Sequence, residues 1–179
     1  MSGDTARISR GRIGLIAWVL AHGGGRQAKT GPLNLFLTLG RHRKLFRGWI
    51  HFAGRLMPGG SLPRRESELV ILRVAHLRDC AYEHAHHARL GRRAGLSMDE
   101  IERVAAGPDA AGWSARDQLL LRAVDELHGT QDLSDATWAA LRAELSETDG
   151  IELVMLAGHY EMLATAITAL RIPPDPPRR

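Results

Sequence analysis

The sequence predicts an all-α protein. Apolar residues recur at the three- and four-residue spacing of a helix in one segment after another. Gly and Pro residues that stop helices, and Ser residues that start them, separate these segments. No segment shows a strand pattern that competes with the helical one. We therefore divide the chain into a basic N-terminal helix with a Gly-rich break (residues 1–30), a main helical domain (31–172) and a Pro-rich tail with little to bury (173–179).

The N-terminal part predicts two helical stretches. The first covers residues 7–21 and is ended by the glycines Gly23–Gly25. The second covers residues 32–57, with an interruption near Gly40, and Pro58–Gly60 ends it. Both stretches carry basic residues interleaved with apolar ones, which is typical of core-forming helices with a solvated basic face.

Two helices follow in the centre of the chain. Ser61 is a suitable N-cap for a helix that runs to about Arg78. The next helix is predicted from about Cys80 to Ala94, with Gly95 as its left-handed C-terminal residue and Leu96 as the hydrophobic contact that accompanies such an end.

Side-chain caps predict where the later helices begin. The expected caps are Ser97 with Glu100, Ser114 with Asp117, and Ser134. In the helix after Ser134, the spacing of Trp138, Leu141 and Leu145 predicts one buried stripe. A final helix over residues 149–171 is apolar around most of its circumference, so we expect it at the centre of the fold or at a subunit interface.

Composition excludes several classes of protein. The chain has 179 residues, with 24 Lys and Arg against 20 Asp and Glu, and one cysteine, Cys80. A chain of this length can bury a core without disulfides or structural metals. A single cysteine excludes an intramolecular disulfide and a cysteine-rich zinc site. These features favour a reducing, cytoplasmic location, and we expect no cofactor and no metal.

Charge is distributed unevenly along the chain. Residues 1–58 carry ten Lys and Arg and one acidic residue, whereas the remainder is acidic overall. A basic segment is a feature of nucleic-acid-binding proteins, but no recognition motif accompanies it, so we expect no nucleic-acid partner. The apolar stretch Ile13–Ala21 follows Arg residues as in a signal peptide, yet it is far shorter than the ~20 residues of a membrane helix. We therefore expect an amphipathic helix, no membrane partner, and an attraction between the two halves or between neighbouring subunits.

Residues that can carry chemistry are concentrated just after the predicted junction of the two central helices. Glu83, His84 and His87 lie three, four and seven positions after Cys80, so a helix places all four side chains on one face. His86 points away from that face, and we expect it at the surface. The sequence therefore predicts a site that combines a thiol, a carboxylate and two imidazoles.

Cys80 itself has two interpretations. A lone cysteine in a helix is most often a small buried apolar residue. In the first turn of a helix, however, the dipole and the N–H groups favour a thiolate, whereas the neighbouring Asp79 opposes it. We expect the first-turn position and the imidazoles to make Cys80 more reactive than a structural thiol.

Three segments resemble the carboxymuconolactone decarboxylase family, which includes the alkyl hydroperoxidase D-like proteins. The segments are Arg65–Ala75, Cys80–His87 and Arg92–Leu96, with a weaker likeness over Leu153–Leu170. In the peroxidase branch the motif is Glu, eleven residues, Cys, two residues, Cys, three residues, His. Glu68, Cys80 and His87 match it in identity and spacing, and Glu83 stands where the motif has its second cysteine.

The resemblance implies an all-helical domain that forms homo-oligomers, often trimers or hexamers. It also implies that Glu68 and His87 form a proton relay to the thiol. One unbroken helix would separate Glu68 from Cys80 by about 18 Å of rise, so the chain has to break near Arg78, with Asp79 as a reasonable N-cap for the second helix. Tyr82 is the candidate for substrate binding.

Three classes of function stay open. The first is a single-cysteine peroxidase-like antioxidant enzyme, in which an external thiol or another subunit resolves the oxidised Cys80 because Glu83 replaces the second cysteine. The second is an acid–base enzyme of decarboxylase or isomerase type, in which His84, His87, Glu68 and Glu83 shuttle protons on a small carboxylated or carbonyl substrate. The third, and least favoured, is a metal-binding or non-catalytic protein, because the spacing of Glu83 and His86 fits only half of a di-iron helix motif.

Overall fold

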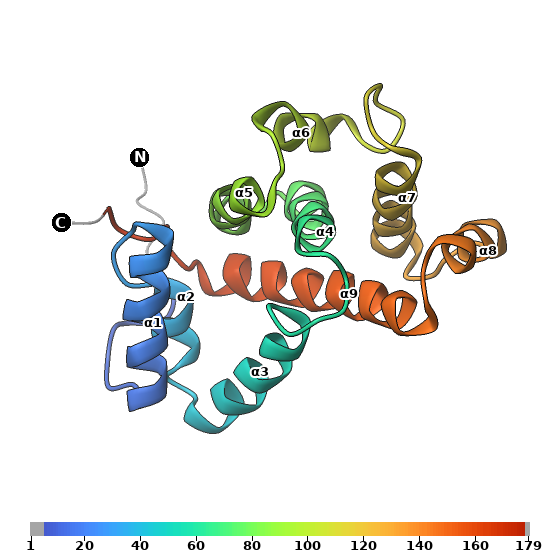
Figure 1. Ribbon diagram of the computed structural model, residues 1–179. Coiled ribbons are helices and arrows are strands. Elements are labelled where there is room, and N and C mark those ends of the chain that lie inside the picture. The colour runs from blue at the N-terminus through green and yellow to red at the C-terminus, as the bar shows by residue number, and fades with distance from the viewer. Residues whose placement is uncertain (1–5, 178–179) are drawn as a thin grey trace. The chain divides into compact units, whose positions relative to one another are not determined.

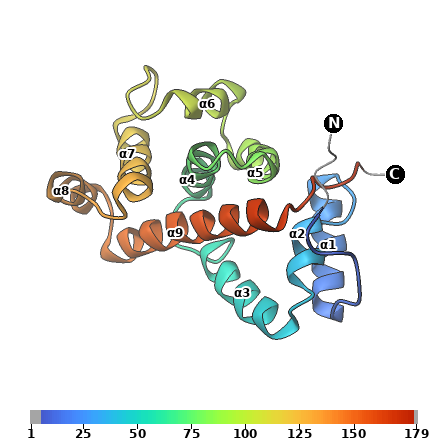
Figure 2. The same cartoon turned by 180° about the vertical axis from the view of Figure 1, so that it is seen from behind.

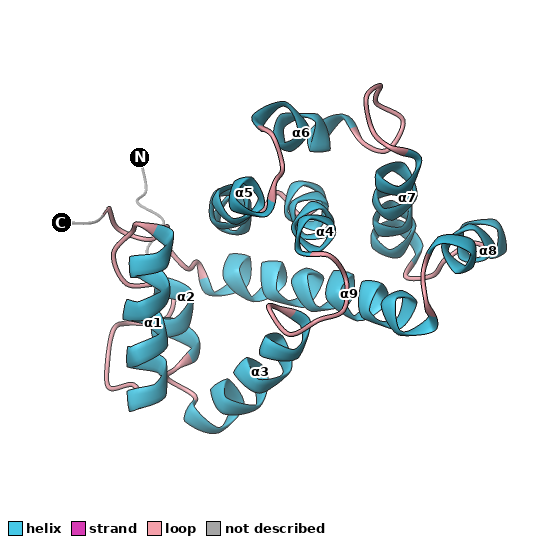
Figure 3. Ribbon diagram, viewed as in Figure 1, coloured by secondary structure: helices cyan, strands magenta, loops and turns pink. Residues whose placement is uncertain are grey.

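The structure is a computed structural model that describes residues 6–177, and within that range it contains helices and no strand (Figures 1 and 3). The predicted all-α class is confirmed. The elements are α1 (Leu15–Ala28), α2 (Asn34–Leu39), α3 (Arg43–Leu56), α4 (Arg64–Leu77), α5 (Ala81–Ala94), α6 (Met98–Arg103), the 3₁₀ helix η1 (Val104–Ala106), α7 (Ala115–Thr130), α8 (Asp135–Glu144) and α9 (Glu147–Leu170).

The chain divides into two compact units. The first consists of Met1–Ala53 with Thr165–Arg179, and the second is Gly54–Ala164. The boundaries fall inside α3 and α9. Every candidate site residue of the sequence lies in the second unit.

In the first unit, α1 differs from the predicted helix over residues 7–21. It begins at Leu15, runs through the three glycines and ends where Lys29 adopts a left-handed φ of 57°. The reason is close packing: a Cβ added at Gly25 would lie 2.2 Å from the backbone oxygen of Gly31. At Gly24, an added Cβ would lie 2.6 Å from Leu33 Cδ1. The glycines therefore allow a close approach, and this packing outweighs their helix penalty of roughly 0.5–1 kcal/mol each.

The C-terminal segment of the first unit is held by hydrogen bonds. The side chain of Asn34 donates to the backbone oxygens of Pro173 and Pro174, and its backbone N–H donates to Asp175 Oδ1 at 2.7 Å. The N–H of Gly31 donates to the backbone oxygen of Pro176. Of the predicted tail 173–179, the described residues are therefore attached to the start of α2, and residues 178 and 179 lie outside the described range.

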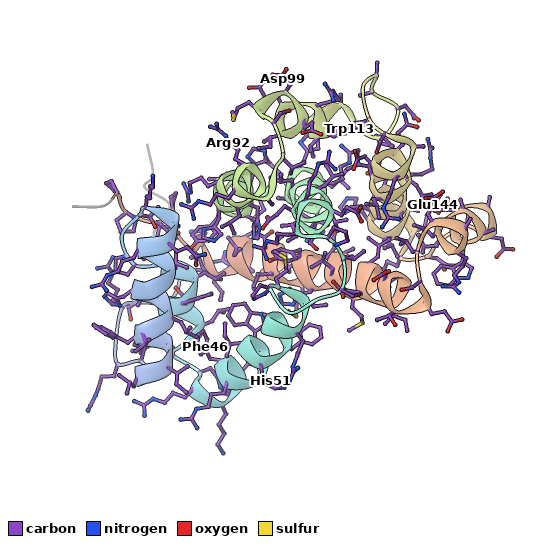
Figure 4. The ribbon with its side chains drawn as sticks, in the orientation of Figure 1. Phe46, His51, Arg92, Asp99, Trp113 and Glu144 are labelled. Carbon is purple, nitrogen blue, oxygen red and sulfur yellow. The ribbon has the colours of Figure 1, made fainter. Side chains whose placement is uncertain are left out.

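In the second unit, α4 is the central helix, with α5 and α7 beside it (Figures 1 and 2). All of its residues from Ser67 to Ala75 are buried. Leu69 and Leu72 of α4 pack in a cluster that includes Trp113, from the segment between η1 and α7 (Figure 4). This helix is therefore the part of the core on which the site is built.

Ion pairs fix α7 against α4. Arg73 binds both carboxylate oxygens of Asp125, at 2.6 and 2.9 Å, and Arg65 binds both oxygens of Asp117, at 2.7 and 3.1 Å. The two arginines are eight residues apart, as are the two aspartates, so α4 and α7 run parallel. The Arg73 guanidinium is also satisfied by the backbone oxygen of Val104, which a buried cation requires.

Most of the predicted helix ends are confirmed. The three serine caps accept backbone N–H groups as expected: Ser97 from Glu100 in a capping box, Ser114 from Asp117, and Ser134 from Thr137. Gly95 ends α5 with a φ of 106°, and Leu96 is buried. The interruption near Gly40 is present between α2 and α3.

Two other predictions in this region are wrong. Ser61 does not cap α4, because its hydroxyl donates to the carboxylates of Asp149 and Glu152, and the helix begins after Pro63. Trp138 does not join the buried stripe of Leu141 and Leu145, because 42% of it is exposed.

The final helix is long and apolar. By length and composition alone α9 could cross a bilayer, but the core helix of a folded protein passes the same test, and 44% of its most apolar window is buried. Ile151, Met155 and Met162 are exposed. The expected homo-oligomer stays a prediction.

The glycines of α1 provide a test of the packing argument. We expect Gly25→Ala to lower the free energy of unfolding by roughly 1–3 kcal/mol, because the new methyl group would overlap the backbone at Gly31. Gly23→Ala is the matched control, because nothing lies within 4 Å of an added Cβ there. That variant should be more stable than the parent by roughly 0.5–1 kcal/mol. Urea unfolding measures both, and equal effects of the two substitutions would contradict the close approach at Gly25.

Candidate functional site

The site begins at the turn that separates α4 from α5. The N–H of Cys80 donates to the oxygen of Ala75 at 2.8 Å, and the N–H of Asp79 donates to the oxygen of His76 at 3.0 Å. With Asp79 at a φ of 48°, these two bonds form the Schellman motif that ends a helix. The predicted break is therefore present, but Asp79 terminates α4 and does not cap α5. The N-cap of α5 is Cys80 itself, so the turn fixes the position of the thiol.

A buried hydrogen bond between a glutamate and a histidine connects the two helices. Glu68 of α4 is fully buried, and its Oε2 lies 2.7 Å from Nδ1 of His87 on α5. Its Oε1 lies 2.6 Å from the guanidinium of Arg64. Gly91, one turn after His87, allows the helices to approach closely, because a Cβ there would lie 3.6 Å from Glu68 Cβ and 2.8 Å from Leu96 Cδ1. The structure thus brings together Glu68 and His87, which the sequence placed on different helices.

A second pair consists of Cys80 and Glu83. Both side chains are buried, with exposed fractions of 3% and 2%, and the thiol interacts with the Glu83 carboxyl group. Burial raises the pKa of Glu83 to about 8; the contact with Cys80 lowers it in part, and the nearby Glu161 raises it further. Around neutral pH this carboxyl group therefore holds its proton for most of the time.

The electrostatics of the thiol correct one expectation from the sequence. Burial raises the pKa of Cys80 to about 11, and the charge of Glu83 acts in the same direction. The backbone N–H groups of Glu83 and Tyr82 favour the thiolate, as expected for a first-turn position, but they do not outweigh burial. The expectation of a favoured thiolate is therefore wrong for this resting state, because the sequence did not show how deeply Cys80 is buried.

Two residues of α9 that sequence reasoning missed complete the site. The ring of Tyr160 lies edge-on to the ring of His87, with centroids 5.0 Å apart. Burial, and after it the charges of Glu68 and Glu83, raise the pKa of Tyr160. Burial and then His87 lower the pKa of the adjacent His159 to about 4. A signal was present in the sequence, since 159–161 is the only run of titratable residues in the apolar part of the helix after Glu152.

Glu161 links the site to α4 and α7. Its Oε1 lies 2.6 Å from Nδ1 of His128, and its Oε2 lies 3.3 Å from Nε of Arg78. The charge of Glu161 also acts on Glu83. The charge of Glu161 therefore opposes the ionisation of Glu83, the carboxyl group that interacts with Cys80.

The remaining candidates occupy different places. His84 lies near His76 of α4, and burial with the charge of His76 lowers its pKa. Tyr82 is half-buried in the first turn of α5. The expectation that His86 lies at the surface is wrong: the residue is half-buried with Nδ1 fully enclosed, because its ring packs against that of His87 at 5.4 Å, and burial lowers its pKa to about 3.

Side chains that could hold a metal do not gather in the described part of the chain. Among residues 6–177, no group of three or more His, Cys, Asp or Glu side chains has a suitable arrangement. The half-motif noted in the sequence consists of Glu83 and His86. Glu83 interacts with the thiol of Cys80, whereas His86 packs against the ring of His87.

The comparisons with known proteins cover the part of the chain that contains this site. The sequence profile of the carboxymuconolactone decarboxylase family matches residues 43–126, a range that includes Glu68, Cys80 and His87. The resemblance expected from the sequence is therefore confirmed for this part of the chain. No curated protein matches the sequence.

Three solved structures have a similar fold. The crystal structure of an alkylhydroperoxidase AhpD core, an uncharacterized peroxidase-related protein from Ralstonia eutropha JMP134, is 17% identical, and the match covers 97% of each chain with a TM-score of 0.84. An uncharacterized peroxidase-related protein from Silicibacter sp. TM1040 is 15% identical, with 94% of this chain and 91% of that chain covered and a TM-score of 0.80.

The third is a protein of unknown function from Agrobacterium tumefaciens, described as an AhpD of antioxidant defence. It is 19% identical to this chain, and the match covers 74% of this chain and 91% of that protein's chain, with a TM-score of 0.68. At these identities the likeness shows the fold, which is that of AhpD-like proteins.

The raised pKa of Glu83 makes stability depend on pH. The folded protein keeps a proton on Glu83 up to about pH 8, whereas an unfolded chain releases it near the ordinary value of 4.5, so the free energy of unfolding falls as pH rises between these values. His86 and His159 act in the opposite direction, but only below their ordinary value of 6.5. We expect Glu83→Gln to flatten the decline in stability between pH 6.5 and 8, as measured by urea unfolding at both values.

The control is Glu102→Gln, at an exposed position of α6, which should keep the decline of the parent protein. If the parent and Glu83→Gln lose the same stability over this range, Glu83 does not hold its proton in the folded state.

Proposed function

We propose that the protein is a single-cysteine peroxidase-type oxidoreductase that reduces a hydroperoxide at Cys80. The observation that carries this proposal is the enclosed thiol, which interacts with a carboxyl group of pKa about 8 at the junction of the two helices that share the Glu68–His87 pair. The likeness to AhpD-like folds and the family profile over residues 43–126 support the same class of reaction.

The reaction balances with one thiol and one hydroperoxide. The sulfur of Cys80 attacks the outer oxygen of the O–O bond, the bond breaks, and the leaving oxygen takes a proton to become an alcohol or water. Cys80 is oxidised to a sulfenic acid, and the hydroperoxide is reduced. One proton leaves the thiol and one proton is gained by the leaving oxygen, so the step is balanced.

Proton transfer is the task that this site has to perform. Because the thiol is protonated at rest, a base has to accept its proton during the attack. Glu83 interacts with the thiol, and the roughly one tenth of this carboxyl group that is ionised at pH 7 can act as that base. A carboxyl group with a pKa of about 8 is well suited to exchange protons near neutral pH. His87 is held through Nδ1 by Glu68, so Nε2 is the nitrogen that is left to exchange a proton with the substrate.

The oxidised cysteine then needs an external reductant. Glu83 stands where the two-cysteine motif has a resolving thiol, and the chain has no other cysteine. One small-molecule thiol attacks the sulfenic acid to give a mixed disulfide and water, and a second releases Cys80 and leaves as the oxidised disulfide. Cys80 of another subunit in a homo-oligomer is the alternative resolving group.

A second candidate function is acid–base catalysis on a small carboxylated or carbonyl substrate. The observation that favours it is the pair of raised pKa values at Cys80 and Glu83, because a carboxyl group that keeps its proton at neutral pH can serve as a general acid without any role for the sulfur. In that case Cys80→Ser leaves turnover largely intact.

The test is chemical trapping of the sulfenic acid. The protein is mixed with equimolar hydrogen peroxide and a cyclic dione that reacts with sulfenic acids, and intact mass and peptide mapping follow the adduct. We expect an adduct at Cys80, none in Cys80→Ser, and rates at least about tenfold lower in Glu68→Gln and His87→Ala, because general acid–base catalysis contributes about 10²–10⁴-fold.

The control is His51→Ala, an exposed histidine of α3, which should leave the rate unchanged. The absence of an adduct from the folded parent protein would overturn the peroxidase proposal. An adduct that forms as fast in His87→Ala as in the parent would remove the Glu68–His87 pair from the mechanism.

A further inference from the structure

A pocket of about 350 Å³ lies between α4, α7 and α9. Its lining residues are Val74, Arg78, Val124, Leu127, His128, Gln131, Val154, Ala157, Gly158 and Glu161. Cys80 is not among them. The proposed peroxidase chemistry therefore does not use this space, although Glu161 at its wall acts electrostatically on Glu83.

The pocket has an apolar end and a polar end. Each of the three helices contributes first a valine and then, one or two turns later, a polar residue to the lining. Arg78 and His128 both bind the carboxylate of Glu161, so the polar residues converge at one end. Because α4 and α7 run parallel, Val74 and Val124 lie together at the other end.

The polar end contains hydrogen-bond donors. Arg78 and the Gln131 amide carry several N–H groups, whereas the carboxylate of Glu161 is already bound on both oxygens, by Arg78 and by Nδ1 of His128. A guanidinium can bind two carboxylates at once, as Arg65 does here with Asp117 and Glu100. A ligand group that accepts hydrogen bonds and carries negative charge therefore fits beside Arg78.

We propose that this pocket binds a small monocarboxylate with an apolar body. Its carboxylate binds Arg78 and Gln131, and its hydrocarbon part lies against the valines and the small residues Ala157 and Gly158 of α9. A volume of 350 Å³ is at the lower end of the range for small-molecule sites, which limits the ligand to a short chain or a single ring. The inference goes beyond the proposed peroxidase function and does not depend on the reactivity of Cys80.

Isothermal titration calorimetry with hexanoate tests this proposal directly. We expect hexanoate to bind the parent protein and Cys80→Ser equally. Acetate lacks the apolar body and 1-hexanol lacks the carboxylate, so each should bind at least about tenfold more weakly than hexanoate. Arg78→Gln should weaken hexanoate binding by about tenfold or more through loss of a charge-assisted hydrogen bond.

A matched pair of variants locates the site. Val154→Trp fills the pocket and should abolish binding, whereas Met155→Trp, at the next residue and outside the lining, should leave it unchanged. These residues are 36% and 45% exposed, so both variants should fold, which circular dichroism verifies.

The other outcomes overturn the proposal. They are no heat of binding with hexanoate up to about 10 mM, equal binding of hexanoate and 1-hexanol, or equal binding by the two tryptophan variants. Because Cys80→Ser is included, failure here is distinct from failure of the peroxidase chemistry, which the trapping experiment measures separately.

Discussion

Glu68 is fully buried, and the partners that its carboxylate requires determine how α4 and α5 are arranged. Arg64 supplies one partner from the same helix, and His87 supplies the other from the next helix. A histidine nineteen positions later in one straight helix would be far out of reach, so α5 has to turn back along α4. The Schellman turn at Asp79 makes this reversal within three residues, and the close approach at Gly91 brings His87 into contact. Cys80 lies where the chain reverses, and its side chain is buried.

The two buried glutamates of the site have different surroundings. Glu68 is paired with an arginine and a histidine. Glu83 faces a thiol and the charge of Glu161, and burial raises its pKa to about 8. Two carboxyl groups in such different environments can take different parts in proton transfer. In the proposed mechanism, Glu83 stands where the related motif has its second cysteine and exchanges protons, so that Cys80 has to be restored by an external thiol or another subunit.

Local signals in the sequence predicted much of the fold, and tertiary contacts explain the misses. Ser97, Ser114 and Gly95 act within one turn of a helix, so their effects could be read from neighbouring residues. The glycines of α1 were read as a break, because their close packing against Gly31 and Leu33 is invisible in the local pattern. At the site, motif spacing found Glu68, Cys80, Glu83 and His87. It could not find Tyr160 and Glu161, which arrive from a helix some eighty residues away, or the burial that raises the pKa of the thiol.

The central claim is that Cys80 and Glu83 form a proton-holding pair, and the pH dependence of Cys80 alkylation tests it most directly. The chain has one cysteine, so iodoacetamide labelling followed by mass spectrometry reports this thiol alone. With a thiol pKa of about 11, the rate should rise continuously from pH 7 to 10 without reaching a plateau, and in Glu83→Gln the same curve should shift to lower pH because the negative charge is lost. A plateau below pH 8.5 in the parent protein, or an unshifted curve in Glu83→Gln, would contradict the account.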